Sequence, residues 1–207
     1  MGWGERMSDN SVRPTQATMR VIAGKYRRRL LRALSGTDVR PTADRLRETL
    51  FNVLCAGDPE ALAGSVWLDL YAGTGAVGIE ALSRGAGMVY FVESSKAAAE
   101  LIGENLKSLG IGSGFRILKA EVAKALAQLE GSGVMADLVF LDPPYRMQEK
   151  YARTLGALGE SKLVRASSVV IAEHEKRFDP GESFEKLVRY RKLMQGDVGL
   201  SFYRRDI

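Results

Sequence analysis

The sequence of 207 residues contains few side chains suited to redox, metal or nucleophilic chemistry. It has one cysteine, Cys55, and one histidine, His174. A single cysteine cannot form an internal disulfide, and one cysteine with one histidine cannot complete the usual Cys/His zinc site. These scarcities disfavour a metal centre and catalysis by a Cys–His or Ser–His pair. We interpret Cys55 as a buried small hydrophobe and His174 as a structural residue at a strand end.

Long hydrophobic runs are also missing. No apolar run approaches the roughly 18 to 20 residues that span a bilayer, and the polar first 18 residues lack the apolar stretch of a signal peptide. The length suits one domain with a substantial core and a short appendage. We therefore expect a cytoplasmic protein built on one α/β domain, with residues 1–18 as a flexible tail.

Positive charge is concentrated in one segment. The net charge is +5, but residues 20–47 hold nine basic side chains and two acidic ones, whereas residues 48–207 carry a net charge of −2. A cationic segment attached to a near-neutral domain suits binding to the phosphate backbone of a nucleic acid. The alternative is an ordinary solvated surface.

The basic segment contains short strands and one helix in our interpretation. Residues 19–34 predict one or two short strands that carry basic side chains. Residues 41–54 predict a helix with Thr42 as its N-cap, because apolar residues recur there at helical spacing. We expect the apolar face of this helix to dock on the main domain while Arg45 and Arg47 point elsewhere. Residues 19–55 then form a basic extension.

Strands and helices alternate from Val66 onward, which predicts a doubly wound, mostly parallel sheet. The expected strands are 66–71, 88–93, 115–120, 136–142 and 167–174, and helices are expected to end near Ser83 and to span about 95–109, 122–129 and 148–158. Segments 186–194 and 200–205 predict an antiparallel hairpin that closes the sheet edge. Residues 56–207 would form this Rossmann-like domain.

A glycine-rich loop follows the first of these strands. Gly73, Gly75 and Gly78 form a G-x-G-x-x-G pattern, which permits a tight turn and close approach of a ligand, although a purely structural turn is the alternative. Glu93 ends the next strand, where a carboxylate can accept the ribose hydroxyl protons. Asp69 would repel a dinucleotide pyrophosphate but attract an ammonium and a sulfonium. The loop therefore favours S-adenosylmethionine over NAD.

Glu121 follows the third strand and has two interpretations that stay open. Either it or the adjacent backbone meets the adenine amino group, or it is a helix-start residue favoured by the helix dipole. The residues we predict to bind the cofactor are Asp69, Tyr71, Gly73, Thr74, Gly75, Glu93, Ser94, Glu121, Val122 and Asp142.

The predicted catalytic segment is Asp142, Pro143, Pro144 and Tyr145, directly after the fourth strand. A rigid turn is the alternative, because prolines lack an N–H and restrict the preceding residue. The exocyclic amine of a nucleobase is a poor nucleophile until its hydrogens are held. We expect Asp142 and the Pro143 carbonyl to accept them, Tyr145 to stack on the base for about 1 to 3 kcal/mol, and orientation to lower the barrier by roughly 7 to 11 kcal/mol.

Together these motifs resemble the RsmD family of small-subunit ribosomal RNA guanine methyltransferases. The resemblance covers residues 19–206, and RPTADRLRETLFN at residues 40–52 is its most specific part. It implies a seven-stranded class I methyltransferase fold, S-adenosylmethionine as cofactor and methylation of the 2-amino group of one guanine in 16S ribosomal RNA. We also expect a monomer that acts on ribosomal RNA within a small subunit or an assembly intermediate. The residues expected to face RNA are Arg27, Arg28, Arg29, Arg40, Thr42, Arg45 and Arg47.

Three other functions fit parts of the sequence. A DNA or RNA adenine-N6 methyltransferase would use the same Asp-Pro-Pro-Tyr segment, although the basic extension is small for reading a DNA sequence. An NAD-dependent oxidoreductase would share the glycine pattern but leaves Asp69 and Asp142 unexplained. A non-enzymatic RNA-binding module would have no affinity for a cofactor.

Overall fold

A computed structural model describes residues 19–33, 41–144 and 146–206, without the side chains of residues 41–43. The basic extension begins with a small antiparallel hairpin of β1 (Met19–Arg20) and β2 (Leu30–Leu31), in which Met19 pairs with Leu31. Helix α1 (Pro41–Leu54) follows. It begins at Pro41, a residue suited to the first helical position because it has no N–H to leave unpaired. Thr42 therefore lies inside the first turn, and its prediction as the N-cap is wrong.

The main sheet has the strand order β5-β4-β3-β6-β7-β10-β9-β8. Its strands are β3 (Val66–Leu70), β4 (Met88–Val92), β5 (Phe115–Leu118), β6 (Ala136–Leu141), β7 (Val164–Glu175), β8 (Ser183–Phe184), β9 (Leu187–Gln195) and β10 (Val198–Arg205). The first five strands in this order are parallel, and β10 runs antiparallel to both β7 and β9. The predicted parallel sheet with a C-terminal hairpin is confirmed. The two-residue β8 adds an eighth strand to the seven expected.

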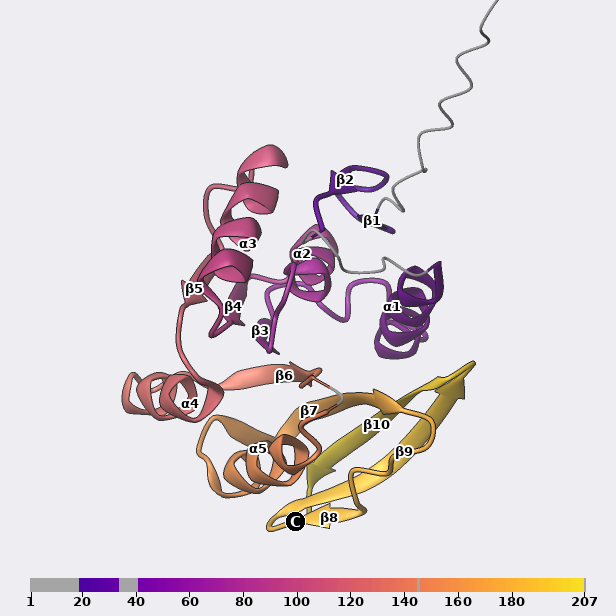
Figure 1. Ribbon diagram of the computed structural model, residues 1–207, viewed down its shortest axis with the longest axis vertical. Helices are drawn as coiled ribbons and strands as arrows, with labels where there is room; N and C mark the ends of the chain where they lie inside the picture. Colours follow the sequence, from indigo (N-terminus) through magenta and orange to yellow (C-terminus); the bar gives the residue numbers. More distant parts are fainter. Residues whose placement is uncertain (1–18, 34–40, 145, 207) are drawn as a thin grey trace, which may run out of the picture.

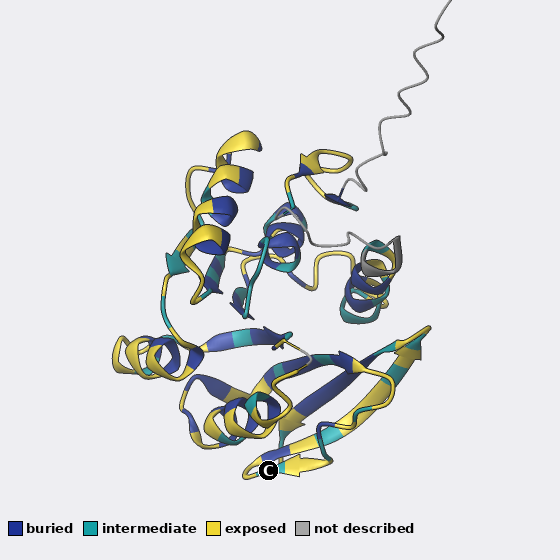
Figure 2. Cartoon of the chain, viewed as in Figure 1, coloured by how far each residue is buried: buried dark blue, intermediate teal, exposed yellow. Residues whose placement is uncertain are grey.

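Helices cover both faces of this sheet (Figure 1). They are α2 (Ala76–Ser83), α3 (Lys96–Ser108), α4 (Val122–Gly131) and α5 (Glu149–Glu160). The hairpin, α1, α2 and α3 share one apolar cluster with one face, while α4 and α5 form a second cluster on the other. Figure 2 shows the buried residues in the sheet and on the inner sides of these helices. This two-sided cover is why the parallel strands are apolar on both faces.

Helix α1 docks on the sheet through the apolar face that the sequence predicts. Leu46, Leu50 and Phe51 are buried, and the ring of Phe51 stacks on Trp67 of β3 at 5.3 Å between centroids. Cys55 lies just beyond this face and packs half-buried against the same apolar cluster, so its predicted burial is only partial. Leu46 and Leu50 also line a cavity at the carboxyl ends of β3, β6 and β7, so the helix covers that edge of the sheet.

The β1–β2 hairpin is held on α2 by a fully buried carboxylate. Glu80 of α2 accepts hydrogen bonds from the backbone N–H groups of Ile22 at 2.7 Å and Ala23 at 3.0 Å, and it pairs with Arg84 at 2.7 Å. Gly24 approaches α2 so closely that a Cβ there would lie 1.9 Å from the carbonyl oxygen of Ser83. The hairpin is therefore fixed to the main domain at a defined position.

Candidate functional site

Three carboxylates meet at the carboxyl ends of adjacent strands. Asp69 lies near the end of β3, Asp142 follows β6, and Glu173 lies near the end of β7. Side chains alternate along a strand, and Trp67, Phe140 and Ile171, each two residues earlier, pack in the cluster on the α1 side. A cavity of about 190 Å³ lies there under α1. We call it the carboxylate cavity, and its lining includes Arg47, Asp69, Gly73, Asp142 and Glu173.

Asp69 is buried and links the cavity to the start of α2. Its Oδ2 accepts a hydrogen bond from the backbone N–H of Gly78 at 2.9 Å. Burial raises the pKa of Asp69 to about 8, because the ionised form loses its hydration, although the bond from Gly78 opposes the shift. Gly78 must be glycine, since a Cβ there would lie 2.3 Å from the ring of Phe91. Asp69 is therefore poised to ionise when a positive charge arrives.

Asp142 and Glu173 lie close enough to influence each other's titration. Burial raises the pKa of Asp142. Burial also raises the pKa of Glu173 well above its usual value, the charge of Asp142 adds to that shift, and the charge of Arg47 opposes it. Two neighbouring carboxylates cannot both ionise easily in a poorly hydrated site. The pair is therefore suited to hold hydrogen-bond donors and to accept one proton.

Arg47 is part of this cavity and not of the exposed RNA surface, so its predicted role in RNA contact needs correction. Its side chain is only 5% exposed. Its guanidinium donates to the carbonyl oxygen of Arg20 at 2.5 Å and pairs with Asp44 at 2.9 Å, which ties α1 to β1. Its Nε is buried without a hydrogen-bond partner among the described residues. An unpaired buried donor at the edge of a cavity is available to an acceptor on a ligand.

The glycine loop turns tightly through left-handed backbone conformations, which are strained only at Tyr71. Tyr71, Gly73 and Gly75 have φ angles of 60°, 55° and 77°, in the left-handed region. A Cβ at Gly73 would meet nothing closer than the carbonyl oxygen of Tyr71 at 4.0 Å, so the space above this residue is open. Glu93 accepts from the N–H of Gly73 at 2.9 Å and so lies beside the loop, and its contact with a ribose stays a prediction.

The remaining predicted cofactor residues divide between two cavities. Thr74 lines the carboxylate cavity. Glu121 and Val122 line a separate cavity of about 530 Å³ between α4 and α5. Tyr71 lines both, and its hydroxyl is hydrogen-bonded to Thr154 at 2.8 Å. Ser94 is exposed after β4.

Glu121 occupies the N-cap position of α4, but its side chain makes no capping hydrogen bond. Its carboxylate lies 3.9 Å from the ammonium group of Lys150 and is largely exposed. Neither the predicted contact with adenine nor the helix-start interpretation is tested by this arrangement.

The proline turn after β6 keeps one carbonyl group free. The carbonyl oxygen of Pro144 accepts from the N–H of Met147 at 2.8 Å, whereas that of Pro143 has no partner among the described residues. Pro143 is buried and Pro144 is exposed. Two of the predicted residues, Tyr145 and Arg40, and the side chain of Thr42 lie outside the described residues. The prediction that the Pro143 carbonyl holds a substrate hydrogen is compatible with this geometry and stays a prediction.

The other arginines assigned to RNA that the structure describes are exposed. Arg27, Arg28 and Arg29 lie in the loop between β1 and β2, and Arg45 lies on the outer side of α1. Arg29 donates to the carbonyl oxygen of Ser108 at 2.9 Å, at the end of α3. These four side chains are accessible to a polyanion, and their contact with RNA remains a prediction.

The described residues fit S-adenosylmethionine. The open space above Gly73 admits a ligand close to the backbone, and the ionised form of Asp69 would attract a cation and repel a phosphate. The unpaired Nε of Arg47 matches a carboxylate, such as that of the methionine moiety. Glu93 beside the loop is placed for ribose hydroxyl groups. A ligand with a sulfonium, an ammonium and a carboxylate meets each of these requirements.

Glu173 was missed in the sequence, although a signal for it exists. It lies in the predicted strand 167–174, two residues after Ile171, and the structure pairs Ile171 with Phe140. The next residues on the same face are Glu173 and Asp142. Asp142 had been singled out as catalytic, so strand alternation and pairing register would have indicated Glu173. The burial of Arg47 carried no such signal, because charged residues are mostly exposed.

Comparison with known proteins decides the family. The family described as Conserved hypothetical protein 95 matches residues 19–204. The chain belongs to this family. A relative in the family, "Ribosomal RNA small subunit methyltransferase D" of Escherichia coli K12, is 30% identical over 91% of this chain and 90% of its own. "Putative rRNA methyltransferase YlbH" of Bacillus subtilis is 33% identical over 90% of this chain and 99% of its own.

A solved structure of the family supports the same conclusion. "Putative methyltransferase yhhF" from Escherichia coli has a TM-score of 0.78 at 28% identity and covers 91% of this chain and 98% of its own. The predicted RsmD family and class I methyltransferase fold are confirmed. The chain is an S-adenosylmethionine-dependent methyltransferase.

Two further observations concern the residues that the structure describes. Among them, no helix is long and apolar enough to cross a membrane. The same residues contain no cluster of three or more His, Cys, Asp or Glu side chains that could hold a metal ion. His174 bonds Ser201 through Nε2 at 3.0 Å and the carbonyl oxygen of Glu175 through Nδ1 at 2.9 Å, within the sheet. These bonds occupy both ring nitrogens in structural contacts.

Proposed function

We propose that this methyltransferase modifies the exocyclic 2-amino group of a guanine in 16S ribosomal RNA. The observation that carries the proposal is the pairing of Asp142 with Glu173 beside the glycine loop, in one cavity under α1. The names of the relatives in the family point to small-subunit ribosomal RNA. The exposed arginines of the extension are suited to the phosphate backbone of such a substrate.

Asp142 and the Pro143 carbonyl hold the acceptor amine in this proposal. The lone pair of an exocyclic amine is delocalised into the ring, and two acceptors on its hydrogens favour a pyramidal, nucleophilic nitrogen. S-adenosylmethionine supplies a methyl group on a sulfonium, which is already activated for transfer. The Asp142 carboxylate then takes the proton that the amine loses, at an Oδ atom, and passes it to water. Orientation by the rigid proline turn supplies most of the rate, since positioning is worth roughly 7 to 11 kcal/mol.

Glu173 favours guanine over adenine. Guanine presents two neighbouring donors on its pairing edge, the N1–H and the 2-amino group. Adenine presents one amino group beside an acceptor nitrogen. An ionised carboxylate accepts hydrogen bonds and a protonated carboxyl keeps one accepting oxygen, so the two groups in one cavity can meet the two donors of guanine. An adenine-N6 methyltransferase would leave one of the two acceptors facing a ring nitrogen.

The proposal also covers the state of the substrate and of the enzyme. The target base must leave its stack to reach a cavity under a helix, and structured RNA is read largely through shape and exposed bases. A small ribosomal subunit or an assembly intermediate presents such a base in a fixed shape. We also propose that the enzyme is a monomer and acts in the cytoplasm, where these particles are assembled.

Transfer of a labelled methyl group tests the proposal. The chain is incubated with labelled S-adenosylmethionine and small subunits from cells that lack the family enzyme, and the RNA is digested to nucleosides. We expect label in N2-methylguanosine. Label only in N6-methyladenosine would overturn the guanine assignment. Transfer to naked RNA but not to subunits would overturn the proposal that the substrate is an assembled or assembling subunit. Absence of transfer to any RNA would overturn the function itself.

A further inference from the structure

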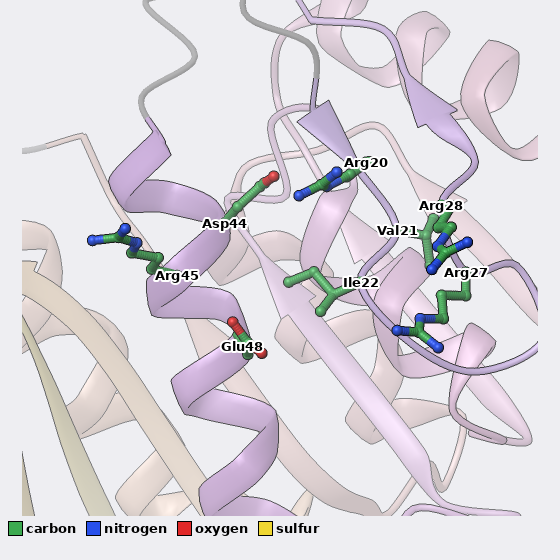
Figure 3. A pocket seen from close by; sticks show the side chains of 8 residues that line it. All are labelled: Arg20, Val21, Ile22, Arg27, Arg28, Asp44, Arg45 and Glu48. Atoms are coloured by element: carbon green, nitrogen blue, oxygen red, sulfur yellow. The ribbon is translucent and has the colours of Figure 1, made fainter.

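A second cavity near the site has no part in the proposed chemistry. It has a volume of about 530 Å³ and lies between the β1–β2 hairpin and α1 (Figure 3). Its lining residues are Arg20, Val21, Ile22, Arg27, Arg28, Asp44, Arg45 and Glu48. We call it the hairpin groove. Its volume lies within the roughly 300 to 1,000 Å³ typical of pockets that bind small ligands.

The two walls of the hairpin groove carry opposite charges. Figure 3 shows Arg27 and Arg28 on the hairpin side and Glu48 on α1, with Ile22 between them. Among the described residues, neither Arg27, Arg28 nor Glu48 has an ion-pair partner, and all three are exposed. Arg45 extends from α1 away from the hairpin. The groove therefore offers free cations on one side and a free hydrogen-bond acceptor on the other.

Adjacent residues line the hairpin groove and the carboxylate cavity. Met19 lines the cavity, while its neighbour Arg20 lines the groove. Asp44 lines the groove and pairs at 2.9 Å with Arg47, which lines the cavity. A polymer whose reacting unit occupies the cavity would therefore have an adjacent unit within reach of the groove.

We propose that the hairpin groove binds a nucleotide next to the methylated guanine in an unpaired stretch of RNA. This inference rests on the proposed function. The guanidinium groups of the hairpin take the phosphate of that nucleotide, and the Glu48 carboxylate accepts a hydrogen from the exocyclic amino group of its base. The acidic wall repels a second phosphate, so a duplex with two backbones or a highly acidic peptide fits poorly. The groove thus selects a base that carries an amino group.

The cationic wall is tested with a double variant and a matched control. Arg27→Gln with Arg28→Gln removes two exposed charges from the groove, and Arg116→Gln with Lys124→Gln removes two from a different groove beside β5. Binding of a labelled oligocytidylate is followed by fluorescence anisotropy at rising salt. We expect roughly tenfold weaker binding and a salt slope smaller by about 0.7 for each lost phosphate contact in the groove variant alone. Equal losses of affinity in both variants would mean that binding depends only on net charge, which would overturn the proposal.

The acidic wall is tested with bases that differ in the amino group. Cytosine carries an exocyclic amine and uracil does not. We expect the chain to bind oligocytidylate more tightly than oligouridylate, and we expect Glu48→Gln to reduce this preference while Glu60→Gln, an exposed acid in the loop after α1, does not. An unchanged preference in Glu48→Gln would overturn the role of this side chain.

Methyl transfer to small subunits separates this inference from the proposed function. The groove variant is expected to raise KM for the subunit by a larger factor than it lowers kcat. Transfer by the unaltered chain together with an unchanged KM in the groove variant would overturn the subsite and leave the function standing. No transfer by the unaltered chain would overturn the function, whatever the oligonucleotide results.

Discussion

Asp69 links cofactor binding to pH at the scale of a single residue. The pKa of Asp69 is raised to about 8 in the free protein, so the carboxyl is mostly protonated at neutral pH. A bound cation favours the ionised form, so its binding releases a proton and tightens as pH rises. We expect the affinity for S-adenosylmethionine to rise by up to about tenfold per pH unit below pH 8 and to level off above it.

Calorimetry with two ligands and two variants checks this expectation. The amino group of the ligand titrates in the same range, and S-adenosylhomocysteine has that group without the sulfonium charge. The informative quantity is therefore the difference in ligand affinity, at each pH, between the unaltered chain and Asp69→Asn. This variant keeps an oxygen that can accept the hydrogen bond from Gly78. Parallel pH profiles for the two proteins with S-adenosylmethionine would show that Asp69 does not sense the cofactor.

Glu173 supplies a second prediction at the same scale. Glu173→Gln keeps the size of the side chain but replaces an acceptor with a mixed donor and acceptor. Because leaving a buried donor without its acceptor costs about 1 to 3 kcal/mol, we expect kcat/KM for the RNA substrate to fall roughly 10- to 100-fold, with cofactor affinity nearly unchanged. Glu175→Gln is the control, since Glu175 is exposed at the end of the same strand. Equal turnover in the two variants would show that the Glu173 side chain does not recognise the base.

Helix α1 places two arginines that look equivalent in the sequence in different environments. Arg45 is exposed, whereas Arg47 is buried and ties α1 to β1 through the Arg20 carbonyl and Asp44. Replacing Arg47 with Met leaves these acceptors unpaired, and breaking such a partly buried pair is expected to lower the free energy of unfolding by about 2 to 4 kcal/mol. We expect a Tm several degrees lower for Arg47→Met and an unchanged Tm for Arg45→Met in differential scanning calorimetry. Similar Tm values for both variants would contradict the buried role of Arg47.

Elements were easier to predict from the sequence than the contacts between them. Helices α3 and α5 agree with the expected spans to within two residues, because their apolar residues recur at helical spacing. Strand β6 was recognisable as an apolar run followed by Asp142. Local pattern fixes such elements, but it does not reveal which face of α1 buries Arg47 or that Glu80 binds the hairpin. Those contacts depend on chain segments far apart in sequence, for which a local period carries no information.

The whole molecule unites the basic extension and the methyltransferase domain in one core. Met19, Val21 and Leu31 of the hairpin belong to the same apolar cluster as Trp67 of the sheet, and Glu80 joins the hairpin to α2. The sequence predicts residues 19–55 as an extension of the domain formed by residues 56–207. We infer from the shared core that the two parts unfold together, as a single cooperative unit.

Gly24 offers a test of this unity with a matched control. A Cβ at Gly24 would lie 1.9 Å from a backbone oxygen of α2, at a φ of +77°, whereas a Cβ at Gly57 would meet nothing within 4 Å, at a φ of +86°. Both substitutions by alanine carry a similar backbone strain of about 1 to 2 kcal/mol, but only Gly24→Ala must also displace the hairpin from α2. We expect one unfolding transition in each variant by calorimetry, with the larger drop in Tm for Gly24→Ala. A displaced hairpin also moves Met19 from the carboxylate cavity, so cofactor affinity should fall with Tm in Gly24→Ala only. Two separate transitions, or equal Tm values in the two variants, would mean that the extension is energetically independent of the domain it covers.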